Sequence, residues 1–586
     1  MTDDPIKHVI VLCLENRSFD QMLGCFKEKF PDLDGVDPAA PQTCLDDQGN
    51  AYTQRATTLR QMPNDKAHLW DPHHEVEHVH MQIEGDPDHP AKMKGFVFNF
   101  AKAYPDSSRE ARQYIMDYYP RGFLPGLHSL AEDFTVCDRW FSSLPGPTWP
   151  NRFFALSGTA SGRVAMPSDG THHADLPGFF GQNQETIFDR LNEKGIHWKT
   201  YFHDLPQSWV MRHPRRPNNA ARYFYIREFY HDARGPEEEF PQFCYIEPDF
   251  MGFQQNDDHP PHDVMKGEKL IVDVYNALRS NPKLWASSLL VVFFDEHGGF
   301  YDHVYPPAAR PPDHHREEYT FDQLGVRVPA LLVSPHVERR VEHTQFDHTS
   351  LLRYLIDKWE LRPLGERTAK ASSIAVAIRE QARDDTIAHI TMTVGQLTPP
   401  DPEVEDAGFG ISGHHRALRK FSAYLKAKVW TDSITAADER LPALYPSIVR
   451  IIEVSAFATV WTWRTIHDRL RGRSGRPTAS ISQPDKVHVD SALQRDDAAY
   501  FLIGRKRYAL GLLGDLIKRG GVERRHAIRT LAAITGRPFH EYEKSGFAAG
   551  RAQQRAQPQM RPQAPQAPQA PASGYVDAWV AKHVDG

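Results

Sequence analysis

Three mainly apolar stretches without polar alternation predict strands that are buried on both faces of a sheet. They are residues 8–14, 288–294 and 326–333. Pro329 places the first part of the third stretch at a strand start or at an edge, because proline cannot donate to a sheet ladder. Helical patterns lie between the stretches, at 183–194 and 264–280. Strands that alternate with helices predict an α/β sandwich around a central parallel sheet.

The pattern changes along the chain. Residues 30–130 are loop-rich and His-rich, and we expect them to cover a functional site. After about residue 385 the apolar strands end. Loops are expected at 399–403 and 405–413, and helices at 413–428, 447–471 and 498–518. We therefore predict four parts: a catalytic domain over 1–385, a mainly helical region over 386–552, a Gln/Pro/Ala-rich linker over 553–574 and a short tail over 575–586.

Composition narrows the class of protein. The 586 residues are 40% hydrophobic and 25% charged, which is typical of globular soluble chains, and one core cannot serve this length. A net charge of −7 argues against a general nucleic-acid binder. No apolar run is long enough for a transmembrane helix. The five cysteines have no CxxC spacing, so we expect buried thiols and neither a zinc ribbon nor a disulfide framework.

The strongest chemical signal is a pair of adjacent carboxylates, Asp295 and Glu296, directly after the stretch 288–294. Such a pair is unfavourable in a buried place unless a cation lies beside it. The ends of parallel strands are also the usual place for chemistry in an open α/β sheet. We therefore predict a metal site here, with Asp302 and His303 a few residues further along the chain.

Glu15 and Asn16 follow the first stretch in the same way. A carboxylate and an amide oxygen can both bind a hard cation. The alternative is that Asn16 or Ser18 caps the next helix. Taken alone, this motif favours the helix cap. Together with the carboxylate pair at 295–296, the metal interpretation becomes stronger.

Thr148 lies in a rigid Pro-rich turn before an expected helix start. Its hydroxyl could act as a nucleophile if a metal lowered the hydroxyl pKa. Asn151 and Arg152 could bind phosphate oxygens. The alternative is an ordinary proline turn with a threonine cap.

Several histidines stand beside carboxylates and could bind phosphate or protonate a leaving group. They are His73, His74, His203, His259 and His262. For each of them a polar turn is the competing interpretation, with a helix cap at 263. His348 lies before a predicted helix, where it would cap the helix or support a ligand.

Five motifs in one order resemble the phosphoesterase family of bacterial phospholipases C, plant non-specific phospholipases C and metal-dependent acid phosphatases. They lie at 15–20, 147–152, 256–260, 295–303 and 324–335. The resemblance covers about residues 5–360, and around 256–303 it is closest to the plant type. It implies an alkaline-phosphatase-like three-layer α/β/α fold, followed here by a mainly helical C-terminal region that we cannot match.

The resemblance also implies site residues. The metal ligands would be Glu15, Asn16, Thr148, Asp295 and Glu296. Thr148 would attack phosphorus and form a phospho-threonine, with His74 and His259, and also His203, as catalytic histidines. Phosphate contacts or support for the ligands would come from Asn151, Arg152, His262, Asp302, His303 and His348. The oxygen-rich ligand set favours one divalent Mg²⁺, Ca²⁺ or Mn²⁺ ion, with Zn²⁺ as an alternative.

The expected function is a phospholipase C that releases diacylglycerol from glycerophospholipids at a membrane surface. A broad acid phosphatase or phosphodiesterase with the same site is the alternative. A catalytically dead scaffold is disfavoured because every expected ligand is present.

The C-terminal region could instead act as a membrane- or partner-binding module. Trp461 and Trp463 with a following arginine cluster suit an interfacial helix at 447–471, and a buried helix is the alternative. No Sec or Tat signal is expected from the first residues. A cytoplasmic or peripheral membrane enzyme, or an effector exported by a signal-independent route, would fit this.

Overall fold

The computed structural model describes residues 4–63, 70–167, 179–180, 183–250, 255–315 and 319–392, together with five residues between 414 and 421. The chain divides into two compact units, Met1–Tyr445 and Pro446–Gly586, and every described residue belongs to the first. The elements predicted at 399–413, 447–471 and 498–518, the linker and the tail lie outside the described residues.

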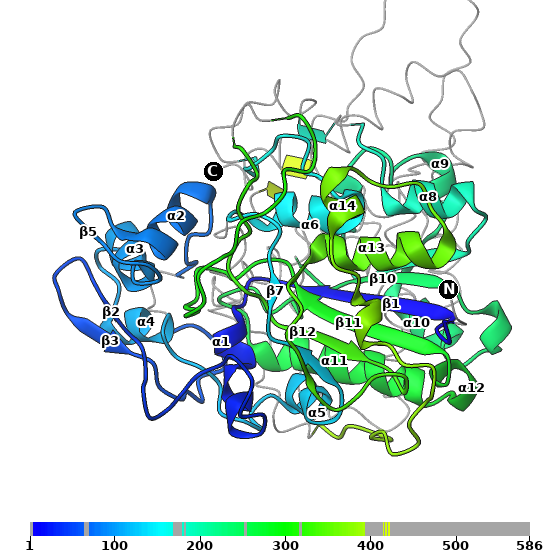
Figure 1. Ribbon diagram of the computed structural model, residues 1–586, viewed down its shortest axis with the longest axis horizontal. Coiled ribbons are helices and arrows are strands. Elements are labelled where there is room, and N and C mark those ends of the chain that lie inside the picture. The colour runs from blue at the N-terminus through cyan, green and yellow to red at the C-terminus, as the bar shows by residue number, and fades with distance from the viewer. Residues whose placement is uncertain are drawn as a thin grey trace, which may run out of the picture. The chain divides into compact units, whose positions relative to one another are not determined.

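An eight-stranded sheet forms the centre of the first unit (Figure 1). Its spatial order is β13 (Val341–Glu342), β6 (Thr135–Cys137), β12 (Ala330–Val333), β11 (Ser288–Phe294), β1 (His8–Leu14), β10 (Phe243–Glu247), β8 (Trp198–Phe202) and β9 (Tyr223–Tyr225). The five strands from β11 to β9 are parallel.

Strands β1 and β11 have the bounds that the apolar runs predict, and all their residues are buried. They pair from His8 opposite Ser288 to Leu14 opposite Phe294. Both strands therefore end at the same level, and the residues that follow them emerge side by side.

The prediction of a parallel strand over 326–333 is wrong in two respects. The strand β12 begins only at Ala330, after Pro329, which has no N–H to donate. It also runs antiparallel to β11 and to β6. Arg327 lies outside the strand and its side chain is buried in an ion-pair cluster.

Helices cover both faces of the sheet, which confirms the α/β class and the sandwich architecture (Figure 1). One face carries α5 (Pro125–Asp133), α11 (Val264–Arg279) and α12 (Pro282–Trp285), and the other carries α6 (Thr148–Ser157), α13 (His348–Trp359) and α14 (Glu366–Lys370). The predicted helix at 264–280 is α11, with Asp263 as its N-cap. The helix predicted at 183–194 is shorter, α8 (Ile187–Glu193), because the Thr186 capping box starts it.

Further short helices lie around this framework: α1 (Phe19–Met22), α9 (Pro217–Ala220), α10 (Ile226–Asp232) and the 3₁₀ turns Gly24–Glu28, Gln207–Val210, Glu237–Glu239 and Ile374–Ala377. Ser18 is the N-cap of α1, as the alternative interpretation of that motif expected. The two short strands β7 (Trp140–Phe141) and β14 (Phe346–Asp347) pair with each other.

Residues 30–130 are more regular than predicted. They include the hairpins β2 (Thr43–Leu45) with β3 (Ala51–Thr53) and β4 (Gly85–Asp86) with β5 (His89–Pro90), and the helices α2 (Val76–Glu84), α3 (Phe96–Ala103) and α4 (Arg109–Tyr114). Residues of β2, β3, α2, α3 and α4 share a hydrophobic cluster that also includes Phe300 and Tyr301 from the loop after β11. They lie beside the carboxyl edge of the central sheet (Figure 1).

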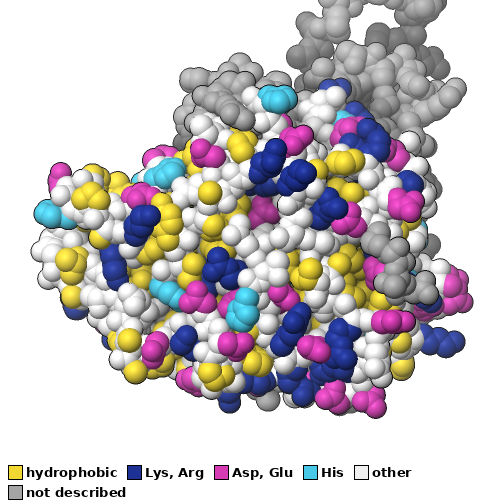
Figure 2. Space-filling model, in the orientation of Figure 1, with side chains coloured by type: hydrophobic (Ala, Val, Ile, Leu, Met, Phe, Trp, Pro, Cys, Tyr) yellow, Lys and Arg dark blue, Asp and Glu magenta, His cyan; other side chains and the backbone are white. Residues whose placement is uncertain are grey.

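All five cysteines are buried free thiols, as expected. Among the described residues, no helix is long and apolar enough to cross a membrane. On the face drawn in Figure 2, acidic, basic and apolar side chains are interspersed. No continuous basic surface of the kind that binds nucleic acid is visible among the residues drawn there in colour.

Candidate active site

The site lies at the carboxyl ends of three neighbouring parallel strands. Glu15 and Asn16 follow β1, Asp295 and Glu296 follow β11, and the loop that carries His259 follows β10. Since β1 lies between β11 and β10, the three segments meet around the end of β1. This is the position where open α/β sheets bind their ligands.

A close backbone approach holds two of these segments together. Gly298 has a φ of 65°, and a Cβ atom there would lie 2.3 Å from the backbone oxygen of Asn16. Asn16 itself has a φ of 56°. Its backbone N–H donates to Asp295 Oδ1 over 3.1 Å. The loop after β11 therefore needs glycine at this position to reach the end of β1.

Thr148 is the first residue of α6, and its side chain is completely buried. Its Oγ1 lies 3.3 Å from Glu15 Oε2 and 3.4 Å from Asn16 Oδ1. The Asn151 amide holds the preceding turn, since it donates to the Gly146 oxygen and accepts from the Leu144 N–H. The hydroxyl thus lies between two acceptor oxygens at a helix N-terminus, where backbone N–H groups favour an anion.

Arg152 links two of the carboxylates. Its Nη2 lies 2.7 Å from Glu15 Oε1, and its Nε donates to Asp295 Oδ2 over 2.9 Å. Glu296 Oε2 accepts from the Gly298 N–H over 2.6 Å, whereas Glu296 Oε1 has no hydrogen bond among the described residues. Two of the three buried carboxylates therefore pair with one guanidinium, and the third, Glu296, does not contact it.

The pKa values reflect this environment. Burial raises the pKa of Glu15 and Glu296, and burial together with Glu15 raises the pKa of Asp295 to about 6. A cation placed between buried carboxylates would strongly stabilise their ionised forms.

Two of the predicted histidines lie at the site. The Nε2 atom of His74 is 3.8 Å from Glu296 Oε1, and its Nδ1 bonds to the Pro72 oxygen. Burial would lower the pKa of His74, but Glu296 and Asp71 raise it to about 9, so the ring is charged at neutral pH. The His259 ring lies 6.2 Å from the His74 ring, edge to face.

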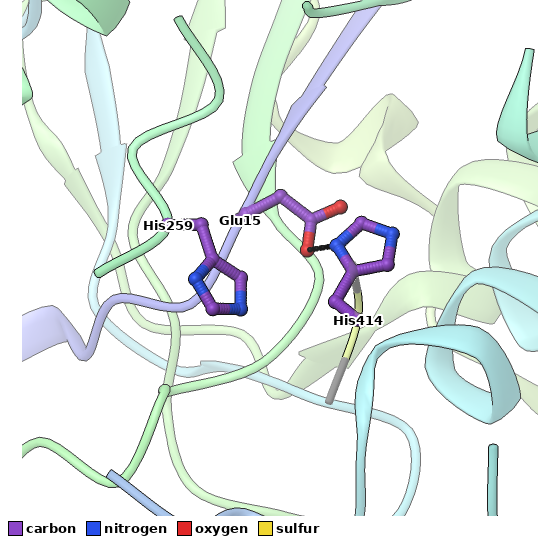
Figure 3. A group of neighbouring side chains, drawn as sticks. All are labelled: Glu15, His259 and His414. Carbon is purple, nitrogen blue, oxygen red and sulfur yellow. Dashed lines mark ion pairs between the residues drawn. The ribbon is translucent and has the colours of Figure 1, made fainter. Parts of the chain in front are cut away.

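One residue at the site was missed by the sequence reasoning. His414 is 1% exposed, and its Nδ1 lies 3.2 Å from Glu15 Oε2 (Figure 3). Burial lowers its pKa to about 3, so the ring is neutral. It falls within the predicted helix 413–428, whose described residues are helical. Nothing in the sequence distinguishes it among 31 histidines, because its role depends on where the chain returns in space.

The other predicted residues lie at varying distances from this centre. His348 bonds to the Asp295 backbone oxygen over 2.7 Å, and His262 bonds to Asp257. His203 contacts the Glu247 backbone oxygen and the Asn256 side chain. His73 stacks on His78 and lies 3.1 Å from Glu75; these three residues form a separate group of metal-compatible ligands.

Asp302 and His303 are not brought to Thr148. They form a separate cluster with Asp20, Asp34 and Arg327. Arg327 donates to Asp302 and Asp20, and His303 bridges Asp20 and Asp34. This cluster anchors the loop after β11, so a direct phosphate contact by either residue has no support in the geometry.

The site has a buried hydroxyl beside three carboxylates, at the carboxyl edge of a parallel sheet. This arrangement is expected of an enzyme with an α/β sandwich that hydrolyses phosphoric esters. The comparisons agree with this class. Residues 6–362 match the Phosphoesterase family, and the chain belongs to that family. It is a phosphoric ester hydrolase.

Two curated relatives are phospholipases C. Non-specific phospholipase C3 of Arabidopsis thaliana is 32% identical over 446 residues, which cover 72% of this chain and 81% of the relative. Phospholipase C A of Mycobacterium tuberculosis is 28% identical over 445 residues, which cover 68% and 78%. Among solved structures, phosphonate monoester hydrolase of Agrobacterium radiobacter is 11% identical, covering 45% of this chain and 74% of that chain, with a TM-score of 0.26. A score this low carries no argument.

Proposed function

We propose that the chain is a metal-dependent phospholipase C that hydrolyses glycerophospholipids to diacylglycerol and a phosphorylated headgroup. The observation that carries the proposal is the buried Thr148 hydroxyl between Glu15 and Asn16, beside Asp295 and Glu296. The names of the relatives support a phospholipid as the substrate class. Because that substrate lies in a bilayer, the enzyme would work as a peripheral protein at the membrane surface.

The site fits a divalent cation. In their ionised forms, Glu15, Asp295 and Glu296 leave excess negative charge after Arg152 and the protonated His74 are counted. Glu296 Oε1 is a buried oxygen without a hydrogen bond among the described residues, and Asn16 Oδ1 and Thr148 Oγ1 lie 3.4 Å apart. Carboxylate, amide and hydroxyl oxygens favour Mg²⁺, Mn²⁺ or Ca²⁺. Such a cation would lower the pKa of the hydroxyl and neutralise charge on the phosphoryl group.

The protein groups would then act in two steps. Thr148 Oγ1, which has released its proton to solvent, attacks phosphorus as an alkoxide, and the bond from phosphorus to the glycerol oxygen breaks. His74 Nε2 gives its proton to the departing alkoxide. In the second step the neutral His74 takes a proton from water, and this water attacks phosphorus. The bond from phosphorus to Thr148 Oγ1 breaks, which restores the Oγ1 alkoxide and releases the phosphorylated headgroup.

Replacing Thr148 tests the nucleophile. Thr148→Ala should lower diacylglycerol release by at least about 10³-fold, because the covalent step is lost, while the fold is kept. The control is Thr135→Ala. Thr135, in strand β6, is equally buried, but its hydroxyl donates to the Glu338 backbone oxygen. Near-normal turnover by Thr148→Ala would show that the nucleophile is assigned wrongly.

A substrate panel separates the two enzyme functions. Diacylglycerol release from phosphatidylcholine vesicles should exceed phosphate release from a simple aryl phosphate, measured at equal enzyme concentration. Activity restricted to the aryl ester would favour the acid phosphatase and would exclude the phospholipase. Removal of metal by a chelator should abolish turnover, and Mg²⁺, Mn²⁺ or Ca²⁺ should restore it.

A further inference from the structure

Glu15, His259 and His414 converge from three distant parts of the chain (Figure 3). Each side chain is at most 1% exposed. One potential ligand atom from each residue lies within 4.8 Å of the others. The Glu15 Oε2 atom and the His414 Nδ1 atom are 3.2 Å apart. Ligands at the usual Zn–N and Zn–O distances of about 2.0–2.1 Å in a tetrahedron are separated by about 3.3 Å. The observed distance of 3.2 Å is close to one such edge.

The backbone contact of His259 is of the kind that metal-binding histidines make. His259 Nδ1 lies 2.5 Å from the Pro260 backbone oxygen, so Nδ1 carries the proton and Nε2 the lone pair. A metal-binding histidine usually donates its other N–H to such an acceptor.

In the structure, the side-chain amide nitrogen of Gln207 lies 3.1 Å from His414 Nε2 and donates to it. The amide nitrogen and oxygen can exchange places by a half-turn of the group. In that orientation Gln207 Oε1, which has no other hydrogen bond among the described residues, accepts from His414 Nε2. The lone pair then lies on Nδ1, the atom that faces Glu15.

We propose that Glu15, His259 and His414 form a second divalent-cation site, of the zinc type, next to the oxygen-ligand site. Two imidazoles and one carboxylate are a ligand set of catalytic zinc centres, and three protein ligands leave a position for water or a phosphate oxygen. The ligands include nitrogen, which Zn²⁺ or Co²⁺ accepts more readily than Mg²⁺ or Ca²⁺. The proposal rests on the proposed function only in that Glu15 serves both sites.

His414 lies beyond residue 362, where the match to the family ends. The second site would therefore depend on the C-terminal part of the first unit. Phe421 packs on Phe180 with ring centroids 5.0 Å apart, and this contact fixes the same segment against the body.

Metal binding to the full-length chain tests the proposal. After chelation and reloading, the wild type should take up two Co²⁺ ions per chain, with the strong visible absorption of four-coordinate Co²⁺ at the site with nitrogen ligands. His414→Ala should bind one ion, lose that absorption and weaken zinc binding at the second site by more than about 100-fold. His414→Gln, which keeps the side-chain size, should behave in the same way if the alanine variant folds poorly. Gln207→Ala should weaken zinc about 10–100-fold and keep the absorption.

His336→Ala is the matched control. This buried histidine bonds to the backbone oxygens of Ala286 and Arg379, so its removal should leave both metal ions in place. A wild type that binds a single ion, or whose cobalt spectrum is unchanged in both His414 variants, would overturn the second site.

Thr148→Ala separates this proposal from the proposed function. That variant keeps Glu15, His259 and His414, so it should lose turnover and keep the nitrogen-ligated cobalt spectrum. An active Thr148→Ala enzyme would refute the nucleophile, whereas the cobalt result would still decide the second site.

Discussion

At the scale of single residues, Arg152 shows how the site is held before any cation binds. Its guanidinium reaches Glu15 and Asp295, which follow different strands. A buried ion pair is worth little against an apolar pair, but removal of one partner leaves buried charge uncompensated. Arg152 therefore stabilises the ligands without being a ligand.

Arg152→Met should lower the free energy of unfolding by about 3–5 kcal/mol in the metal-free protein, because two carboxylates lose their partner. Added Mg²⁺ or Mn²⁺ should recover more stability in this variant than in the wild type. Chemical denaturation with and without chelator measures both effects. Arg362→Met is the control: Arg362 is 62% exposed beside Glu193, and its loss should change stability by less than about 1 kcal/mol. Equal stability of Arg152→Met and wild type without metal would contradict this role.

His303 gives stability a pH dependence. Burial lowers its pKa, but Asp20 and Asp34 outweigh burial and raise the pKa to about 10. The bond from His303, with Arg327 nearby, lowers the pKa of Asp34 to about 2. A raised histidine pKa stabilises the fold fully below about pH 6.5, and this contribution is lost as the pH rises through 10. A lowered aspartate pKa stabilises above about pH 4, and this is lost as the pH falls through 2.

His303→Gln should therefore be less stable than wild type by roughly 1.5–3 kcal/mol at pH 6, the usual value for a charged hydrogen bond. The difference should shrink towards pH 10. Thermal unfolding at pH 6, 8 and 10 measures it. A difference that stays constant over this range would show that His303 acts only through packing.

At the scale of elements, the loop after β11 connects the strand to the site. Its first residues bind Asn16 and Gly298, and Phe300 and Tyr301 further along it enter the cluster of residues 30–130. The loop thus fixes two segments at once, and glycine at 298 is required by the neighbouring backbone.

Gly298→Ala should lower the free energy of unfolding by more than a positive φ alone accounts for. The added Cβ would clash with the Asn16 backbone and displace Asn16, a predicted metal ligand. Gly49→Ala is the matched control, since Gly49 has a φ of 81° and no atom within 4 Å of its Cβ position. It should cost about 1–2 kcal/mol and leave turnover intact. Unfolding and turnover of both variants separate the two effects. Equal losses would show that the close approach is unimportant.

At the scale of the whole molecule, the catalytic centre draws on residues from Glu15 to His414. All the site contacts described lie within the first unit, Met1–Tyr445. The role of the second unit, including the helix predicted at 447–471, remains a prediction.

A chain that ends at residue 445 should keep turnover of a monomeric short-chain phosphatidylcholine, because every described site residue is retained. Its activity on vesicles distinguishes the two interpretations of 447–471: a loss supports the interfacial helix, and no change supports a buried one. A chain that ends at residue 400 lacks His414 and should also lose the second metal ion. Loss of monomer turnover at 445, with the fold intact, would contradict the prediction.

The sequence by itself determined the elements whose environment is uniform along their length. Strands β1 and β11 are buried on both faces, so an unbroken apolar run defined both and placed Glu15 and Asp295 at their ends. The direction of β12 was not predictable, because parallel and antiparallel buried strands have the same apolar pattern. The regularity of residues 30–130 was missed because their short helices depend on a shared cluster.

Only the tertiary structure decided which polar side chains meet. In the folded chain, Asp302 and His303 lie in a separate cluster, and Arg152 pairs with the carboxylates of the site. His414 contacts Glu15, which is almost four hundred residues earlier in the sequence. The physical reason is that the apolar pattern of a segment depends only on which of its own residues are buried. A buried ion pair or metal site needs side chains from several elements, and their meeting depends on how those elements pack.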